Sequence, residues 1–193
     1  MPDLTNWYLN ASLNPLGQEP IPYSVLINDT QNVNLNVKPG TTYFLRIINY
    51  SAFSQIYLTF DQHEVTIIEI DGIYTVPRTV ETLYIAVAQR YGVLLKTKSS
   101  TSTNYAGLAK LDQTGFNGYP DLSPLQNPNG NVYLIYNTAK PLPAPLNITL
   151  DAISQQIIDD FSLTPYDHQP LLRNPAQTVV IELDFFTEGG QNR

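Results

Sequence analysis

Apolar and polar residues alternate with a period of two along parts of this chain. Residues 33–37 read VNLNV, and this strict alternation is typical of a β-strand with one buried face. Other short runs are rich in β-branched and aromatic residues, which also indicates strands. The strands that we expect span residues 24–28, 33–37, 42–49, 56–60, 64–70, 82–87, 92–97, 105–111 and 132–136.

Turn signals separate these runs at intervals of about 8 to 15 residues. Pro39-Gly40 lies between two expected strands, and Asp71-Gly72 follows another, each with the residue types that tight turns require. No segment before residue 150 shows a helical period. The pattern predicts an all-β protein, folded as a Greek-key β-sandwich or barrel.

The pattern changes in the last third of the chain. Pro141, Pro143 and Pro145 predict an extended linker, residues 151–160 one or two helical turns, and residues 177–184 a last strand. We therefore expect an irregular N-terminal segment (residues 1–19), one domain (20–140), a linker with a short helix (141–176) and the start of a further domain (177–193).

The charge of the chain limits its partners. It has 17 acidic and 10 basic residues among 193, a net charge of −7 and a pI of about 4.6. No cluster of Lys and Arg is present to neutralise phosphates, which argues against a nucleic-acid partner. No apolar run approaches the roughly 18 residues that a membrane span needs, so we expect none.

Evidence on the cellular compartment is indirect. The first residues lack the basic start and apolar run of a signal peptide, so the localisation of this chain stays open. Asn10, Asn28, Asn49 and Asn147 lie in N-x-S/T sequons and are candidates for glycosylation. Chance alone gives about two or three such sites in this composition, so the sequons indicate secretion only weakly.

Ligands for soft metals are scarce. The chain has no Cys, two His (His63 and His168) and a single Met at position 1. A type 1 copper centre needs a Cys thiolate and two imidazoles, so we expect no copper to be bound by this chain. His63-Glu64 begins the metalloprotease motif H-E-x-x-H, but Ile67 replaces the second His. We expect His63 to be hydrogen-bonded in a turn and His168 to lie in an exposed loop.

Carboxylates are the remaining candidate ligands, because their oxygens suit calcium, magnesium, manganese or iron. Surface charge and turn chemistry are the simpler explanation for each group of them. Arg90 precedes an expected strand, where its guanidinium is placed to bind carbonyls or a carboxylate. The acidic groups are Asp61, Glu64, Glu69 and Asp71, the pair Asp159 and Asp160, and the pair Glu182 and Asp184.

Several segments taken together resemble the multicopper oxidases, over roughly residues 20 to 140. They are similar to the second plastocyanin-like domain of that family. Within the family, the segments are most similar to the fungal iron-uptake ferroxidases. The phenol-oxidising laccases are the alternative branch. The segments are residues 20–22 (PIP) with 26–29 (LIND), 43–49 (YFLRIIN), 63–64 (HE) with 69–72 (EIDG), and 83–84 (LY) with 88–91 (AQRY).

The resemblance implies a cupredoxin fold in which domains one and three hold copper and domain two is a spacer that shapes the substrate site. In the ferroxidase branch, a Glu two residues before the His-Glu pair helps to bind ferrous iron and to pass its electron to type 1 copper. The matching position here is Asp61, which is one methylene shorter. A second iron carboxylate is expected near the start of domain three, where Asp184 is the nearest candidate. The parent enzyme would contain copper, partner an iron permease and lie at the cell surface or outside the cell.

The chain departs from the family pattern in its copper ligands. The His-x-His pairs of domain one and the His-Cys-His cluster of domain three are missing, and the chain stops at Asn192-Arg193, about where domain three would begin. We therefore expect a fragment without oxidase activity of its own, whose partners are the missing flanking domains. A non-catalytic binding module, or a subunit that docks on a copper protein, are the alternatives.

Overall fold

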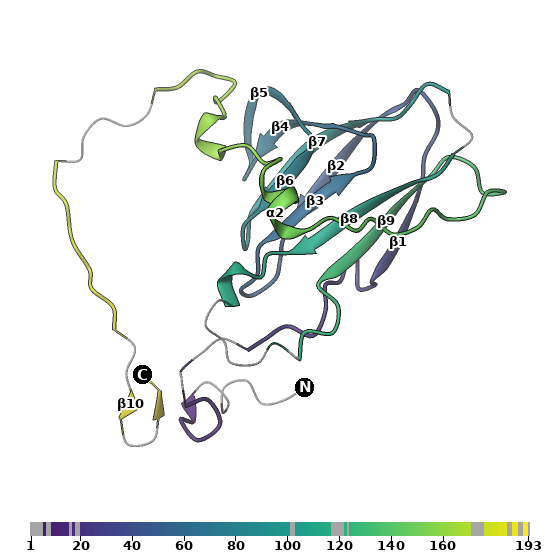
Figure 1. The fold of residues 1–193 in the computed structure, drawn as a ribbon. Coiled ribbons are helices and arrows are strands. Elements are labelled where there is room, and N and C mark those ends of the chain that lie inside the picture. The colour runs from purple at the N-terminus through teal and green to yellow at the C-terminus, as the bar shows by residue number, and fades with distance from the viewer. Residues whose placement is uncertain are drawn as a thin grey trace.

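The computed structural model describes residues 6, 9–15, 17, 20–100, 103–116, 122, 124–170, 176–184, 187–188 and 191–192. Its centre is a pair of β-sheets packed face to face, as expected from the alternating pattern (Figure 1). The five-stranded sheet has the order β1 (Asn32–Asn36), β9 (Asn129–Ile135), β8 (Tyr105–Leu111), β3 (Ile56–Phe60) and β6 (Thr82–Ile85). The four-stranded sheet has the order β2 (Thr42–Ile48), β7 (Arg90–Lys96), β4 (Val65–Ile70) and β5 (Ile73–Val80).

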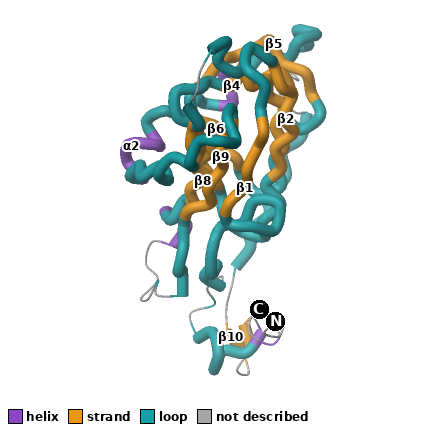
Figure 2. The backbone as a smooth tube through the Cα atoms, turned by 90° about the vertical axis from the view of Figure 1, so that its right-hand side faces the viewer, coloured by secondary structure: helices purple, strands orange, loops and turns teal. Residues whose placement is uncertain are grey.

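Strand β1 is joined to the sandwich by a long-range parallel pairing. It lies beside β9 with Asn32 opposite Asn131, whereas the other neighbouring strands of the two described sheets pair antiparallel. The side view shows β1, β8 and β9 next to one another (Figure 2). The first strand of the domain therefore depends on the last one for its hydrogen bonds.

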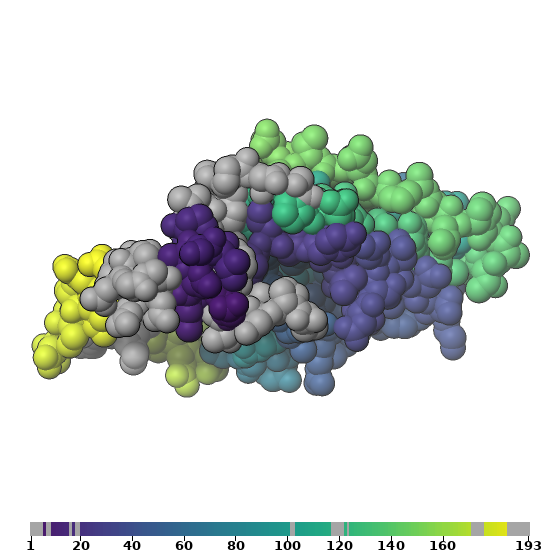
Figure 3. All heavy atoms as spheres, turned by 90° about the horizontal axis from the view of Figure 1, so that it is seen from below, coloured from purple at the N-terminus to yellow at the C-terminus, as the bar shows by residue number. Residues whose placement is uncertain are grey.

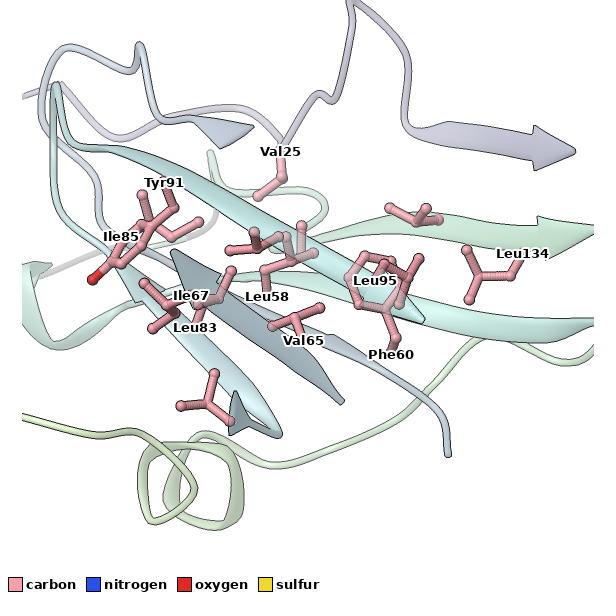
Figure 4. Packing of buried hydrophobic residues seen from close by; sticks show 14 of the residues in the cluster. Val25, Leu58, Phe60, Val65, Ile67, Leu83, Ile85, Tyr91, Leu95 and Leu134 are labelled. Atoms are coloured by element: carbon pink, nitrogen blue, oxygen red, sulfur yellow. The ribbon is translucent and has the colours of Figure 1, made fainter. Parts of the chain in front are cut away.

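The core lies between the two sheets. Val93 and Leu95 on β7 and Leu134 on β9 have no exposed surface, because alternate residues of each strand point inward. Val65 and Ile67 of β4 point into the same layer (Figure 4). Truncating one of these side chains to Ala would cost about 2 to 5 kcal/mol of unfolding free energy.

Strand β5 was not predicted from the sequence. Asp71 and Gly72 form the two-residue turn that was expected, with φ angles of 50° and 89°, and β5 then runs back along β4. β5 is an edge strand that is mostly exposed and contains Pro77, so it shows no alternation of apolar and polar residues. The pairing of β5 is therefore determined by the turn and by β4, and not by an alternation of apolar and polar residues in β5 itself.

The strand expected at residues 24–28 does not form. Ser24 and Ile27 make only isolated bridges, to Asn127 and Thr30 respectively. Asn28 and Asp29 have left-handed φ angles of 49° and 63°, so the chain turns back before a ladder can develop. The first regular strand is therefore β1.

The segment after β9 leads to a short helix, which covers only the first part of the range 151–160 where one or two helical turns were expected. Residues 141–149 have no regular structure, α2 spans Leu150–Ser154, and a 3₁₀ turn, η2, spans Asp160–Ser162. Thr149 caps α2 by accepting a hydrogen bond from the amide of Ala152. Ile153 of α2 is fully buried against Tyr57 and Leu108, so the helix covers the outer face of the five-stranded sheet.

The segment after η2 covers the free edge of β5. The amide of Val76 donates to the carbonyl of Thr164, and the amide of Tyr166 donates to the carbonyl of Tyr74, both at 2.8 Å. Pairing of this kind blocks an edge strand from joining another chain.

The strand expected at residues 177–184 is absent from the structure. The segment is extended and leads away from the sandwich, with Val180 and Leu183 79% and 81% exposed (Figures 1 and 2). The residues have strand-forming character, but no described strand lies beside them, and a strand needs a partner to be stable. Beyond it, β10 (Thr187–Glu188) and β11 (Gln191–Asn192) form a short hairpin.

Within the described part of the chain, no helix is sufficiently long and apolar to cross a membrane.

Candidate functional site

Asp61 lies in the tight turn of residues 60–63 between β3 and β4, called here the Asp61 turn. Its amide donates to the carbonyl of Ala106 at 2.8 Å, which ties the turn to β8. Gln62 has a left-handed φ of 54°, and its Nε2 reaches the carboxylate of Asp61 at 3.4 Å. The Asp61 carboxylate is half-buried and has this one long contact among the described residues.

His63 completes the turn as a structural residue, as expected. It is 6% exposed, its Nδ1 lies 2.7 Å from the carbonyl oxygen of Asp61, and its Nε2 lies 2.6 Å from the hydroxyl of Tyr136. Burial lowers the pKa of His63 below its ordinary value, so the ring is neutral near pH 7. Both ring nitrogens are engaged, so His63 has no free lone pair for a metal.

A hollow of about 270 Å³ lies beside this turn. Asp61 lines it from the turn, Glu64 from just after the turn, and Glu81 from just before β6. Gln156 and Ile148, from the segments on either side of α2, also line it. Within the described residues, no three His, Cys, Asp or Glu side chains are arranged to hold a metal ion.

Asp184 is not brought to this hollow. It is exposed on the extended segment that leads away from the sandwich (Figure 1). Glu182 lies on the same segment and is also exposed. The two carboxylates that were expected to bind iron, Asp61 and Asp184, therefore lie in separate parts of the structure.

A larger hollow of about 560 Å³ opens where β1 and β2 flank the gap between the sheets. A recess between the purple-to-blue and the blue-to-teal parts of the chain is visible from below (Figure 3). The inward residues Val33, Leu35, Leu45 and Ile47 line this hollow and are only half-buried. None of its described lining residues is acidic, so its chemistry differs from that of the Asp61 site.

Comparison with known proteins assigns the family. The profile of the multicopper oxidases matches residues 1–138 of this chain. The chain belongs to the multicopper oxidase family.

The similar multicopper oxidases carry names that refer to iron transport. The iron transport multicopper oxidase FET3 of Candida albicans is 42% identical over 170 residues, which cover 88% of this chain and 26% of that protein. The protein of the same name in Saccharomyces cerevisiae is 39% identical over 181 residues, covering 94% and 27%. The chain thus spans about a quarter of the length of these curated relatives.

Solved structures confirm the cupredoxin-like fold. The crystal structure of Fet3p, a multicopper oxidase that functions in iron import, matches with a TM-score of 0.87 and 37% identity, covering 98% of this chain and 35% of that one. A laccase from Botrytis aclada matches with a TM-score of 0.50 and 27% identity, covering 60% and 20%. The resemblance to the ferroxidase type therefore extends over more of the chain than the resemblance to the laccase.

The residues of this chain do not fit the copper centres of a multicopper oxidase. A type 1 site requires a Cys, and the chain has none. His63 has both nitrogens in hydrogen bonds, and His168 is exposed in the loop after Pro165, as expected.

Two carboxylates with structural roles were not recognised from the sequence. Asp160 accepts hydrogen bonds from the hydroxyl of Tyr91 at 2.6 Å and from Nε2 of Gln89 at 2.9 Å. Asp112 accepts from the hydroxyl of Tyr84 at 2.7 Å. Burial raises the pKa of Asp112, but the bonds from Thr114 and Tyr84 outweigh burial and leave its pKa below the ordinary value. Partners this distant in sequence leave no local signal.

Arg90 has the structural role that was expected. Its Nη1 donates to the carbonyl of Ala88 at 2.9 Å and lies 3.2 Å from the Asp71 carboxylate. Both side chains are about half exposed, so the ion pair contributes at most about 1 kcal/mol.

The four sequons differ in accessibility. The side chains of Asn28 and Asn147 are exposed and that of Asn10 is half-buried. Asn49 is 8% exposed, and its Nδ2 donates to the carbonyls of Ser54 at 2.8 Å and Ile85 at 3.0 Å. In the folded chain, the amide of Asn49 is therefore committed to the protein interior.

Proposed function

We propose that this chain is the copper-free second domain of an iron-oxidising multicopper oxidase. The similarity to iron transport oxidases over about nine-tenths of the chain supports this assignment. Copper would be held by the flanking domains, which are the first partners of this chain. The exposed, strand-like residues 177–184 support a place at the start of the next domain.

The observation that carries the proposal is the placement of Asp61. Its backbone is fixed in a tight turn, while its carboxylate lines a hollow and has only one long contact among the described residues. A carboxylate oxygen is a ligand of the kind that iron accepts. Asp61 would bind ferrous iron as substrate, together with ligands from the neighbouring domain, for which Asp184 is the candidate in this chain.

The chemistry divides between this domain and the rest of the enzyme. Asp61 would orient Fe²⁺ and stabilise the Fe³⁺ that forms when one electron leaves for type 1 copper, because a carboxylate favours the more highly charged ion. Copper held by the flanking domains would accept these electrons, and four of them with four protons would balance the reduction of one dioxygen to two waters. The chain alone would have no oxidase activity, since it has no electron acceptor.

The setting of the parent enzyme follows from the same assignment. A ferroxidase of the iron-uptake type would act at the cell surface or outside the cell and deliver Fe³⁺ to an iron permease. The sequons at Asn10, Asn28 and Asn147 are compatible with passage through the secretory pathway. A laccase-type oxidase of phenols is the second candidate, supported by the match to the Botrytis aclada laccase.

Steady-state kinetics of the multidomain oxidase that contains this chain test the proposal. Asp61→Ala should raise the KM for Fe²⁺ by about tenfold or more, since a charge-assisted ligand is lost, and leave oxidation of a phenolic reductant unchanged. Asp61→Glu should retain iron oxidation, because it keeps the carboxylate. Equal losses on both reductants would instead favour the laccase type.

Sequencing of the full-length transcript tests the place of the domain. His-x-His motifs upstream and a His-Cys-His cluster downstream are the expected result. A reading frame without them would leave a binding module as the function to examine.

A further inference from the structure

The Asp61 turn is held by the side chains of His63 and Tyr136, which hydrogen-bond to the turn and to each other. We propose that His63 and Tyr136 are positioning residues, which fix the Asp61 turn so that the carboxylate of Asp61 meets ferrous iron in one orientation. The inference rests on the proposed role of Asp61 as an iron ligand. It adds two residues that act on iron only through Asp61.

The direction of each hydrogen bond in this arrangement is determined. The carbonyl of Asp61 can only accept, so Nδ1 of His63 carries the hydrogen and donates over 2.7 Å. In the neutral ring Nε2 then has to accept, and the hydroxyl of Tyr136 donates to it over 2.6 Å. The oxygen of Tyr136 in turn accepts from the amide of Lys98 at 2.8 Å. A continuous series of bonds thus runs from the backbone at Lys98 to the backbone at Asp61.

The imidazole at the centre of this series is buried, while Asp61 and Tyr136 at its two sides are half-buried. His63 is 6% exposed, and the ring of Tyr105 stands edge-on to it, with centroids 4.8 Å apart. Tyr136 lies on another side of the imidazole, with centroids 5.8 Å apart. Hydrogen bonds away from water are stronger and more costly to leave unpaired, so this group of rings favours a single geometry.

The Asp61 turn needs such support because its backbone is unfavourable by itself. Gln62 has a φ of 54°, a left-handed value that a residue with a side chain rarely adopts. The bond from the His63 amide to the carbonyl of Phe60, at 3.1 Å, closes the turn, and the imidazole adds a second clamp on the intervening carbonyl of Asp61. Without the imidazole, the carbonyl of Asp61 loses the hydrogen bond that restrains the peptide between Asp61 and Gln62.

The hydrogen bonds of His63 and Tyr136 also connect the Asp61 turn to both sheets. Tyr136 follows β9 of the five-stranded sheet, and Lys98 follows β7 of the four-stranded sheet. Asp61 itself follows β3. The carboxylate of Asp61 is thereby held in a fixed position relative to both sheets. A ligand that is already ordered loses less conformational freedom when the ion binds.

Hydrogen exchange of the 193-residue chain tests whether His63 and Tyr136 restrain the Asp61 turn, and this test does not depend on the function. Tyr136→Phe removes only the hydroxyl, and we expect the amides of Asp61 and His63 to exchange at least about tenfold faster. Tyr43→Phe is the matched control, because the hydroxyl of Tyr43 also accepts from a backbone amide, that of Lys38 at 2.8 Å, but does not bond to His63. Unchanged exchange in Tyr136→Phe, or equal acceleration in both variants, would overturn the inference. His63→Gln provides a second variant with the same expected result.

Kinetics of the multidomain oxidase test the consequence for iron. Tyr136→Phe should raise the KM for Fe²⁺ about tenfold while kcat with a phenolic reductant stays within about twofold, and Tyr43→Phe should change neither. Equal losses on both reductants would show a general structural defect and overturn the positioning role. If Asp61→Ala raises the KM and Tyr136→Phe does not, the positioning role alone fails. If Asp61→Ala has no effect on iron, the proposed function itself fails, whatever hydrogen exchange shows.

Discussion

Tyrosine hydroxyls donate to carboxylates at two places in this domain, of which Asp112 is buried and Asp160 half-buried. Tyr91 donates to Asp160, and Tyr84 donates to Asp112. Burial, reinforced by the adjacent carboxylate, raises the pKa of both phenols well above the ordinary value of 10.0. Each phenol is therefore held in its protonated form in the folded chain.

Alkaline pH should destabilise the fold for this reason. Above pH 10 the phenols of the unfolded chain release protons while Tyr84 and Tyr91 retain theirs, so the unfolded state binds fewer protons and stability falls as pH rises. The urea midpoint of unfolding should decrease between pH 9 and pH 11. In Tyr91→Phe the decrease should be smaller, and an identical slope in wild type and variant would contradict the mechanism.

The burial of Asn49 gives a second prediction at this scale. A glycan on its Nδ2 would break the bonds to Ser54 and Ile85, so folded protein from a secretory host should carry no sugar there. Asn147 is exposed and is expected to be modified. Peptide mass spectrometry of the folded fraction gives the occupancy of each site.

The matched substitutions give an independent check of the same burial. Asn49→Ala should lower the unfolding free energy by about 1 to 3 kcal/mol, because the carbonyls of Ser54 and Ile85 lose their donor. Asn147→Ala should change it by no more than about 0.5 kcal/mol. A glycan on Asn49 in folded protein would show that the interior accommodates it.

At the scale of elements, the segment from α2 to Tyr166 acts as a strap over both sheets. Ile153 packs on the outer face of the five-stranded sheet, and residues 164–166 pair with the edge of β5. Asp160 fixes the middle of the strap through Tyr91 and Gln89.

Removing the carboxylate of Asp160 should loosen this strap. Asp160→Ala leaves the hydroxyl of Tyr91, a residue that is 2% exposed, without its acceptor, and should cost about 1 to 3 kcal/mol of unfolding free energy. Asp159→Ala is the control, since Asp159 only caps η2 at the surface, and should cost about 1 kcal/mol or less. Urea denaturation gives both values, and limited proteolysis of residues 155–168 should accelerate in Asp160→Ala alone.

Sequence pattern was sufficient for elements whose two faces differ in environment. The strict alternation at residues 33–37 and the Asp71-Gly72 turn both predicted structure that is present. β5 was missed because an exposed edge strand has no buried face to impose alternation. The strand expected at residues 177–184 was wrong because strand propensity cannot supply a partner.

The candidate site was predictable only in part. His63 was assigned a structural role from the lack of a second metal ligand, but its partner Tyr136 lies 73 residues away. Asp160 and Tyr91 are similarly separated, by 69 residues. Such contacts are fixed by the packing of the two sheets, and no local sequence period records them.

At the scale of the whole molecule, this chain lacks the Cys thiolate that a type 1 copper centre of the family requires. The purified chain, incubated with copper and then freed of excess ion, is expected to retain no stoichiometric copper and to show no blue absorption band, since it lacks the thiolate. Metal analysis and a visible spectrum are sufficient for the test. One copper per chain with a blue band would contradict the assignment of this domain as copper-free.

The pairing of β1 with β9 has a consequence for how the domain is made. Asn32 pairs with Asn131, which lies 99 positions further along the chain, so the five-stranded sheet cannot close until nearly the whole domain has been synthesised. During translation, the apolar side chains of β1 stay exposed until β9 has been synthesised. Exposed apolar side chains and unpaired strand edges promote aggregation of nascent chains. A host cell therefore has to protect the first strand until the last one emerges, and the yield of this domain should depend on chaperone supply more than its final stability suggests.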